Sequence, residues 1–131
     1  MEDKAVRYVI STKAGEYDVP ATNLPVQFGP DGSLIVSPMN DSVGFAIAAP
    51  HWTKLERRPA EEFPGGVQWF VETDPGGGGQ PFFWSKPMYD CRVIHGVLVL
   101  LISNELIAMA LAPGQWFSAR KKEFDIQVTP P

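Results

Sequence analysis

The chain has a single cysteine, Cys91, among its 131 residues, so it cannot form an internal disulfide. It also lacks an excess of positive charge, since 11 Lys and Arg residues face 15 Asp and Glu residues and the net charge is −4. A nucleic-acid partner normally requires a basic surface, so the composition argues against one. Residues 1–4 are polar, and no apolar signal region follows them. We therefore expect a cytoplasmic protein.

An uninterrupted apolar run of membrane-spanning length is also missing. Residues 91–112 are the least charged stretch and contain Arg92 and Glu105 as their only charged side chains. A spanning helix needs about 20 apolar residues in succession, and the polar residues 103–105 divide this stretch. The sequence therefore predicts burial inside protein and not contact with a membrane.

The least charged stretch contains two predicted elements. Residues 93–102 are rich in β-branched side chains and predict one central strand that is apolar on both faces. Residues 106–112 are ambiguous. They return antiparallel across a turn at residues 104–105, or they form a short helix that begins at Ser103 or Asn104. The short length favours the hairpin.

Turn signals are frequent, because the chain has 12 Gly and 13 Pro. The clearest is 30–32, Pro-Asp-Gly, which predicts a hairpin between residues 24–28 and 33–37. Residues 5–11 predict a first strand that pairs back with residues 17–19. Residues 53–56 have the spacing of a capping box, which predicts a short helix ended by Pro59.

Strands and turns therefore dominate the predicted fold. Residues 123–128 alternate between apolar and polar side chains and predict a last, half-buried strand. Residues 76–79 are four consecutive glycines and predict a loop, because glycine loses the most entropy on ordering. We predict one all-β domain over residues 1–131, an antiparallel sandwich or barrel of about eight or nine short strands with at most one or two helical turns.

Few residues suggest catalysis. Cys91 and His95 form the most compact reactive pair, but four residues of strand separate them by about 13 Å, which is too far for a nucleophile and its base. With the distant His51 they would still lack a fourth metal ligand. The glycines at 76–79 lack the Gly-Lys-Ser/Thr sequence of a phosphate loop. The sequence therefore predicts no catalytic residue, no cofactor and no metal site.

Aromatic residues are the strongest candidates for binding. The three consecutive rings of residues 82–84 cannot all lie on one side of a strand, so at least one faces solvent or a partner. Rings near turns anchor protein interfaces or stack on sugars. The predicted interface residues are Phe82, Phe83, Trp84, Tyr89 and Trp116.

Three functions follow from these features, in order of preference. The first is a non-enzymatic structural or interaction protein that forms a homo-oligomer or docks into a larger assembly, such as a virion-like particle, through aromatic surfaces. The alternative is a carbohydrate-binding module that uses exposed Trp and Tyr side chains. The third is a small enzyme or metal site around Cys91 and His95.

Overall fold

The computed structural model describes residues 7–20, 26–36, 45–49, 51–73, 81–103 and 106–122. Over these residues the protein is all-β, with twelve strands and no helix. Every strand pair is antiparallel, and no sheet closes into a barrel within the described residues. The predicted antiparallel fold class is thus confirmed. The predicted glycine loop at 76–79, the turn at 104–105 and the strand at 123–128 lie outside the described residues.

The largest sheet, called here the large sheet, has six strands. In spatial order they are β2 (Gly15–Pro20), β1 (Arg7–Thr12), β6 (Trp52–Arg58), β11 (Ile107–Leu111), β10 (Val97–Leu101) and β9 (Asp90–Ile94). β1 and β2 form a hairpin at one end of this sheet, and β9, β10 and β11 form consecutive hairpins at the other end. β6 lies between the two groups and pairs with β1 and β11.

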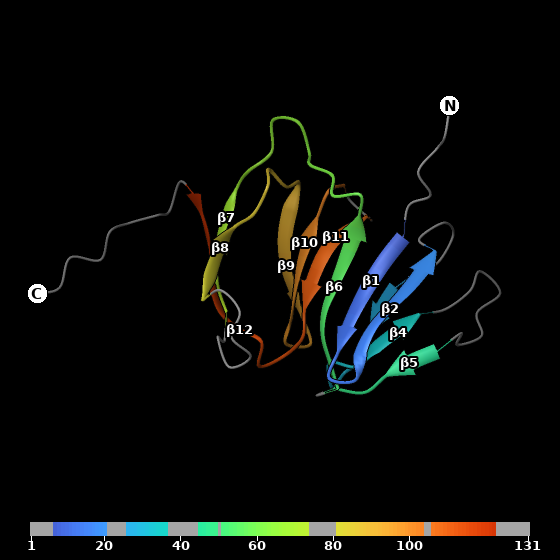
Figure 1. Ribbon diagram of the computed structural model, residues 1–131. Helices are drawn as coiled ribbons and strands as arrows, with labels where there is room; N and C mark the ends of the chain where they lie inside the picture. Colours follow the sequence, from blue (N-terminus) through green and yellow to red (C-terminus); the bar gives the residue numbers. More distant parts are fainter. Residues whose placement is uncertain are drawn as a thin grey trace, which may run out of the picture.

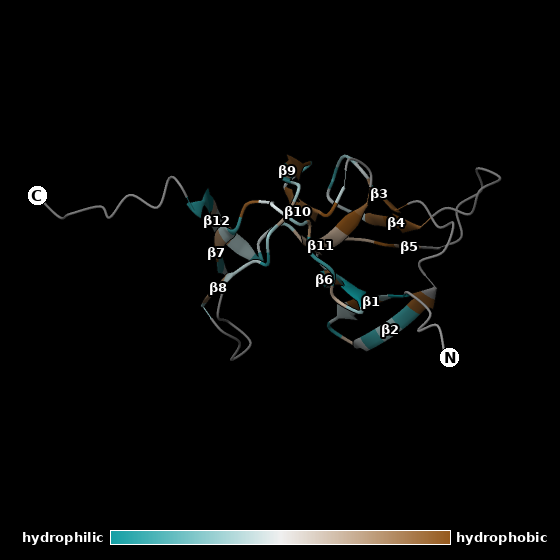
Figure 2. Cartoon of the chain, turned by 90° about the horizontal axis from the view of Figure 1, so that it is seen from above, coloured by the Kyte–Doolittle hydropathy of each residue, from teal (hydrophilic) through white to brown (hydrophobic). Residues whose placement is uncertain are grey.

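Two sheets of three strands complete the structure. The β4 sheet has the order β3 (Val26–Phe28), β4 (Leu34–Val36) and β5 (Phe45–Ile47). The β7 sheet has the order β12 (Trp116–Lys121), β7 (Trp69–Thr73) and β8 (Phe82–Trp84). Figures 1 and 2 show the β7 sheet on one side of β9 and β10, and the β4 sheet on the other side of the molecule.

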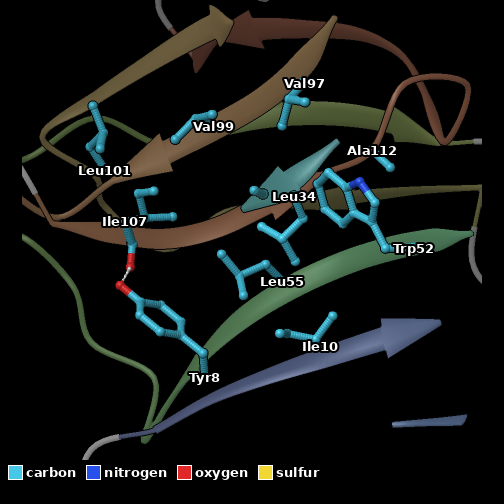
Figure 3. Close-up of a cluster of buried hydrophobic side chains, with 11 residues drawn as sticks. Tyr8, Ile10, Leu34, Trp52, Leu55, Val97, Val99, Leu101, Ile107 and Ala112 are labelled. Atoms are coloured by element: carbon cyan, nitrogen blue, oxygen red, sulfur yellow. Dashed lines mark hydrogen bonds between the residues drawn. The ribbon is translucent and has the colours of Figure 1, made fainter. Parts of the chain in front are cut away.

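The main core lies between the large sheet and the β4 sheet (Figure 3). Leu34 of β4 packs with Trp52 and Leu55 of β6, all three fully buried. The Tyr8 hydroxyl enters this core and donates a hydrogen bond of 2.9 Å to the Ile107 carbonyl. The other buried members of the cluster are Ile10, Val97, Val99, Leu101, Ala110 and Ala112.

A second apolar layer lies between the large sheet and the β7 sheet. Leu98 packs with Val71 of β7, and Leu100 packs with Met88 and the inward ring of Phe83. All five residues of β10 are therefore buried, because their side chains alternate between the two layers. The predicted burial of this strand on both faces is confirmed.

The prediction of one long strand over residues 93–102 is wrong. The chain reverses at His95 and Gly96, and β9 and β10 pair as a hairpin with Ile94 opposite Val97. His95 has φ 51° and Gly96 has φ 82°, the positive pair that a two-residue type I′ turn requires. The sequence does not indicate this hairpin, because residues 93–94 and 97–102 on either side of the turn are equally apolar.

The predicted helix at 53–56 is also wrong, because these residues belong to β6. This strand pairs with β1 on one side and with β11 on the other, so its backbone bonds are made within the sheet. The twelve strands exceed the eight or nine predicted, in part because β6 replaces a helix and because one expected strand is a hairpin.

Three predicted hairpins are confirmed. β1 pairs with β2, β3 pairs with β4 across the Pro30 to Gly32 turn, and β10 pairs with β11. The hairpin reading of residues 106–112 is therefore correct and the helix reading is wrong. Among the described residues, no helix has the length and apolar character needed to cross a membrane.

Candidate interaction site at the edge of the β7 sheet

β8 is an end strand of the β7 sheet, and among the described strands it pairs with β7 alone (Figure 1). The Thr73 amide donates to the Pro81 carbonyl and the Ser85 amide donates to the Trp69 carbonyl, each at 2.8 Å. Along an antiparallel strand, successive residues direct their backbone N–H and C=O groups alternately towards the paired strand and away from it. The backbone groups of Phe82 and Trp84 therefore point to the open edge of the sheet.

The three rings of β8 alternate between the two faces of the sheet. Phe82 is 47 % exposed and Trp84 is 41 % exposed. Phe83 between them is half-buried and packs against Val71 and Met88 in the inner layer. The prediction that at least one ring of this segment is exposed is confirmed, and Phe83 is the ring that turns inward.

Phe70 of β7 lies at the centre of the exposed rings. Its ring centroid is 5.3 Å from that of Phe82 and 5.0 Å from that of Trp84, with interplanar angles of 36° and 57°. We call these three side chains the aromatic face. Tilted ring pairs at these separations attract one another through their quadrupoles, so the aromatic face is a fixed cluster.

Arg120 of β12 completes the aromatic face on the side opposite β8. Its guanidinium carbon lies 5.0 Å from the centroid of the Phe70 ring, in a cation–π contact. Its Nε atom is buried and has no hydrogen-bond partner within the described residues. Next to it, Ser118 Oγ donates a hydrogen bond of 2.6 Å to Glu72 Oε1. The aromatic face therefore presents rings flanked by one cation and one anion.

A pocket of about 160 Å³ opens beside β8, between it and the large sheet. We call it the edge pocket. Its lining is predominantly apolar and includes Phe83, Met88, Leu100, Ala108 and Met109. Ala108 reaches the pocket through a β-bulge, since the register of β10 and β11 shifts between Leu100 and Leu101. Such a bulge places two neighbouring residues of one strand on the same face.

Charged groups surround the mouth of the edge pocket, which Arg57, Glu61 and Lys86 help to line. Arg57 forms an ion pair with Glu61 and lies above the ring of Tyr8. Burial opposes its charge, but Glu61 and Tyr8 outweigh burial and raise the pKa of Arg57 above its ordinary value. Lys86 is exposed. The pocket thus combines an apolar interior with charged groups at its entrance.

The predicted interface residues are not all on one surface. Trp116 is half-buried, packs with Val71 and Leu98, and donates from Nε1 to the Gly96 carbonyl at 3.1 Å. Tyr89 is exposed, but its ring contacts Phe63 edge to face at 5.4 Å. The aromatic face therefore includes Phe82 and Trp84 of the five predicted residues.

Sequence reasoning did not assign Phe70 and Arg120 to the site. Phe70 shares its strand parity with the exposed Glu72, and this alternation was a usable signal. The basic run at 120–122 predicts a solvated turn, which is wrong because Arg120 and Lys121 belong to β12. The contact of Arg120 with Phe70 depends on the pairing of β12 with β7. A sequence distance of 50 residues cannot indicate such a pairing.

Cys91 and His95 occupy different elements. Cys91 lies in β9 and contributes to both inner clusters, whereas His95 is exposed in the turn that follows. The expectation that one continuous strand holds both residues is therefore wrong. Burial, with a smaller contribution from the Asp90 carboxylate, raises the pKa of Cys91 to about 12. A thiol with this pKa is a poor nucleophile near neutral pH.

His51 lies far along the chain from this hairpin, before β6. Within the described part of the chain, no group of three or more His, Cys, Asp or Glu side chains is placed to hold a metal ion. These residues do not form a donor set for the metal site considered above.

Comparisons with protein families, with curated proteins and with solved structures find no match for this chain.

Proposed function

We propose that this protein is a non-enzymatic interaction and assembly domain that associates with protein, including a second copy of itself, through the aromatic face. The observation that carries the proposal is the cluster of the exposed rings of Phe82 and Trp84 on the half-buried ring of Phe70, held at an open sheet edge beside the Arg120 guanidinium. Aromatic and arginine side chains dominate the energetics of protein interfaces.

The ring geometry favours a protein partner over a sugar. A sugar stacks on a ring whose flat face is open, whereas Phe70 has Phe82 and Trp84 tilted against it and the Arg120 guanidinium beside it. A rough cluster of rings suits the interdigitating side chains of a protein interface. The open backbone groups of Phe82 and Trp84 add hydrogen-bonding capacity that an extended protein segment can use.

Sedimentation velocity of the full chain across a range of concentrations tests the proposal. We expect the double variant Phe82→Ser, Trp84→Ser to weaken self-association at least tenfold, about 1.4 kcal/mol. Its free energy of unfolding should fall by about 1–2 kcal/mol, since the rings are 47 % and 41 % exposed but each contacts Phe70.

The matched control is Tyr17→Ser. Tyr17 is also an exposed aromatic side chain, but it lies on β2 at the other end of the large sheet. Equal loss of association in the control and the double variant would contradict the proposal. A wild-type chain that stays monomeric at every concentration and takes up a soluble polysaccharide through Trp84 would replace it with carbohydrate binding.

A further inference from the structure

We infer that the edge pocket and the open edge of β8 receive residues 123–128 of a second copy of this chain, added as an extra strand. The inference rests on the proposed function and names the partner segment. The apolar edge pocket lies directly beside β8, whose outer edge pairs with no other described strand.

The pocket has the dimensions of one large apolar side chain. Its volume is about 160 Å³, and apolar cavities of roughly 150 Å³ bind a benzene molecule. Phe83, Met88, Leu100 and Met109 supply an interior that excludes a charged occupant. A phenyl or branched aliphatic side chain therefore suits it.

The sequence holds a segment of matching pattern. In residues 123–128, Phe124, Ile126 and Val128 alternate with Asp125 and Gln127. This is the pattern of a strand with one apolar face. The segment lies outside the described residues, so only its sequence pattern supports the match.

A strand added to β8 would align these two features. Its backbone would meet the outward groups of Phe82 and Trp84 at the strand spacing of about 4.8 Å. Its inward side chains would project towards the large sheet, where the pocket lies between β8 and Leu100 and Met109. Phe124 or Ile126 then enters the pocket. The neighbouring Asp125 carries a charge opposite to that of Lys86 at the pocket mouth.

The position of β12 indicates that the added strand comes from a second copy and not from the same chain. β12 and β8 lie on opposite sides of β7 (Figure 2), and the Lys122 amide donates to the Gln68 carbonyl at 2.9 Å. To reach the far side of β8 the chain must cross three strand spacings, roughly 14 Å, which takes about four extended residues. That crossing would use Phe124 and Ile126, the residues that the pocket is suited to receive.

The second copy also gives a closed assembly. If each copy donates its segment to the other, the dimer contains two identical junctions related by a twofold axis. The two aromatic faces then lie next to the two added strands, which joins this inference to the proposed interface.

Two kinds of full-chain variant test the exchange. The segment variant is Phe124→Ser, Ile126→Ser, with the outward Gln127→Ser as its control. The pocket variant is Ala108→Leu, which fills the pocket from β11. A second pocket variant, Ala60→Trp, acts from an exposed position at the pocket mouth and does not depend on repacking of the core.

Sedimentation velocity of the variants, alone and mixed, tests whether two copies exchange this segment. We expect the segment variant and each pocket variant to lose self-association at least tenfold, with cooperative unfolding retained in at least one pocket variant. Mixed together, a segment variant and a pocket variant should form a one-to-one heterodimer, because one keeps an intact pocket and the other an intact segment.

Other outcomes overturn the exchange. A segment variant that associates as wild type removes the segment from the interface, and a mixture that does not associate shows that segment and pocket do not complement each other. Phe82→Ser separates the two proposals, since Phe82 belongs to the aromatic face and is not among the pocket-lining residues. If this change weakens association while the segment variant does not, the proposed function stands and the exchange is wrong. If wild type is monomeric, the exchange is wrong and so is the self-association in the proposed function.

Discussion

Two tryptophan side chains show how single residues connect the layers of this protein. Trp52 Nε1 donates to the Gly32 carbonyl at 2.9 Å, and Trp116 Nε1 donates to the Gly96 carbonyl at 3.1 Å. Each indole thus packs its ring against an apolar layer and donates a hydrogen bond to a backbone carbonyl in a turn. Burying an indole without a partner for its N–H would cost free energy, so the bond to Gly32 makes the fully buried Trp52 compatible with the core.

Cys91 shows the opposite case, a reactive group made inert by its surroundings. Burial is the main reason that its pKa rises to about 12, and the Asp90 carboxylate adds to the effect. The folded state therefore resists loss of the thiol proton more strongly than the unfolded chain, whose thiol has an ordinary pKa near 9.

This difference predicts a loss of stability at alkaline pH. The contribution of the protonated thiol is fully present below pH 9 and declines as pH rises towards 12, because the unfolded chain ionises first. We expect the urea midpoint of wild type to fall more between pH 8 and pH 10.5 than that of Cys91→Ala. Tyr8, whose pKa burial also raises, is common to both proteins. Equal falls in the two proteins would contradict the assignment.

At the scale of elements, the β9–β10 hairpin depends on an unusual turn pair. His95 is a non-glycine residue with positive φ in the described structure. L-residues with a Cβ pay for this conformation, whereas Asn tolerates it and Asn-Gly is the favoured type I′ pair. The histidine is therefore placed where another residue would suit the backbone better.

We expect His95→Asn to raise the free energy of unfolding by about 0.5–1 kcal/mol, measured by urea denaturation. His51→Asn is the control, since His51 is exposed and is not among the residues with positive φ. A decrease in stability in His95→Asn, or loss of association without any change in stability, would show that the imidazole has a role beyond the turn.

At the scale of the whole molecule, β10 joins two apolar layers. Leu98 faces the layer beneath the β7 sheet, and Leu101 faces the core shared with the β4 sheet. Both side chains are almost fully buried. A single strand therefore couples the packing of all three sheets.

Leu98→Ala and Leu101→Ala should each lower the free energy of unfolding by about 2–5 kcal/mol, as expected for a cavity in a packed core. Val93→Ala is the control, because Val93 is 59 % exposed on the adjacent strand, and it should change stability by about 0.5 kcal/mol or less. Thermal unfolding followed by near- and far-UV circular dichroism should show one transition in each variant. Two separate transitions in Leu98→Ala would contradict a single cooperative domain.

The sequence alone determined the fold class and several hairpins. Proline, aspartate and glycine at 30–32 act on their own backbone, and β-branched runs favour strands wherever they occur. Such local effects are present in the residues themselves. The alternation of rings at 82–84 also follows from strand geometry alone, and the structure confirms it.

Tertiary structure decided what local signals left ambiguous. Residues 53–56 have a helix-start signal, but pairing with β1 and β11 satisfies their backbone in the centre of a sheet. The aromatic face and the edge pocket combine side chains from strands far apart in the chain. Which strands become neighbours depends on how three sheets bury their apolar faces together, and that free energy belongs to the packed molecule and not to any one segment.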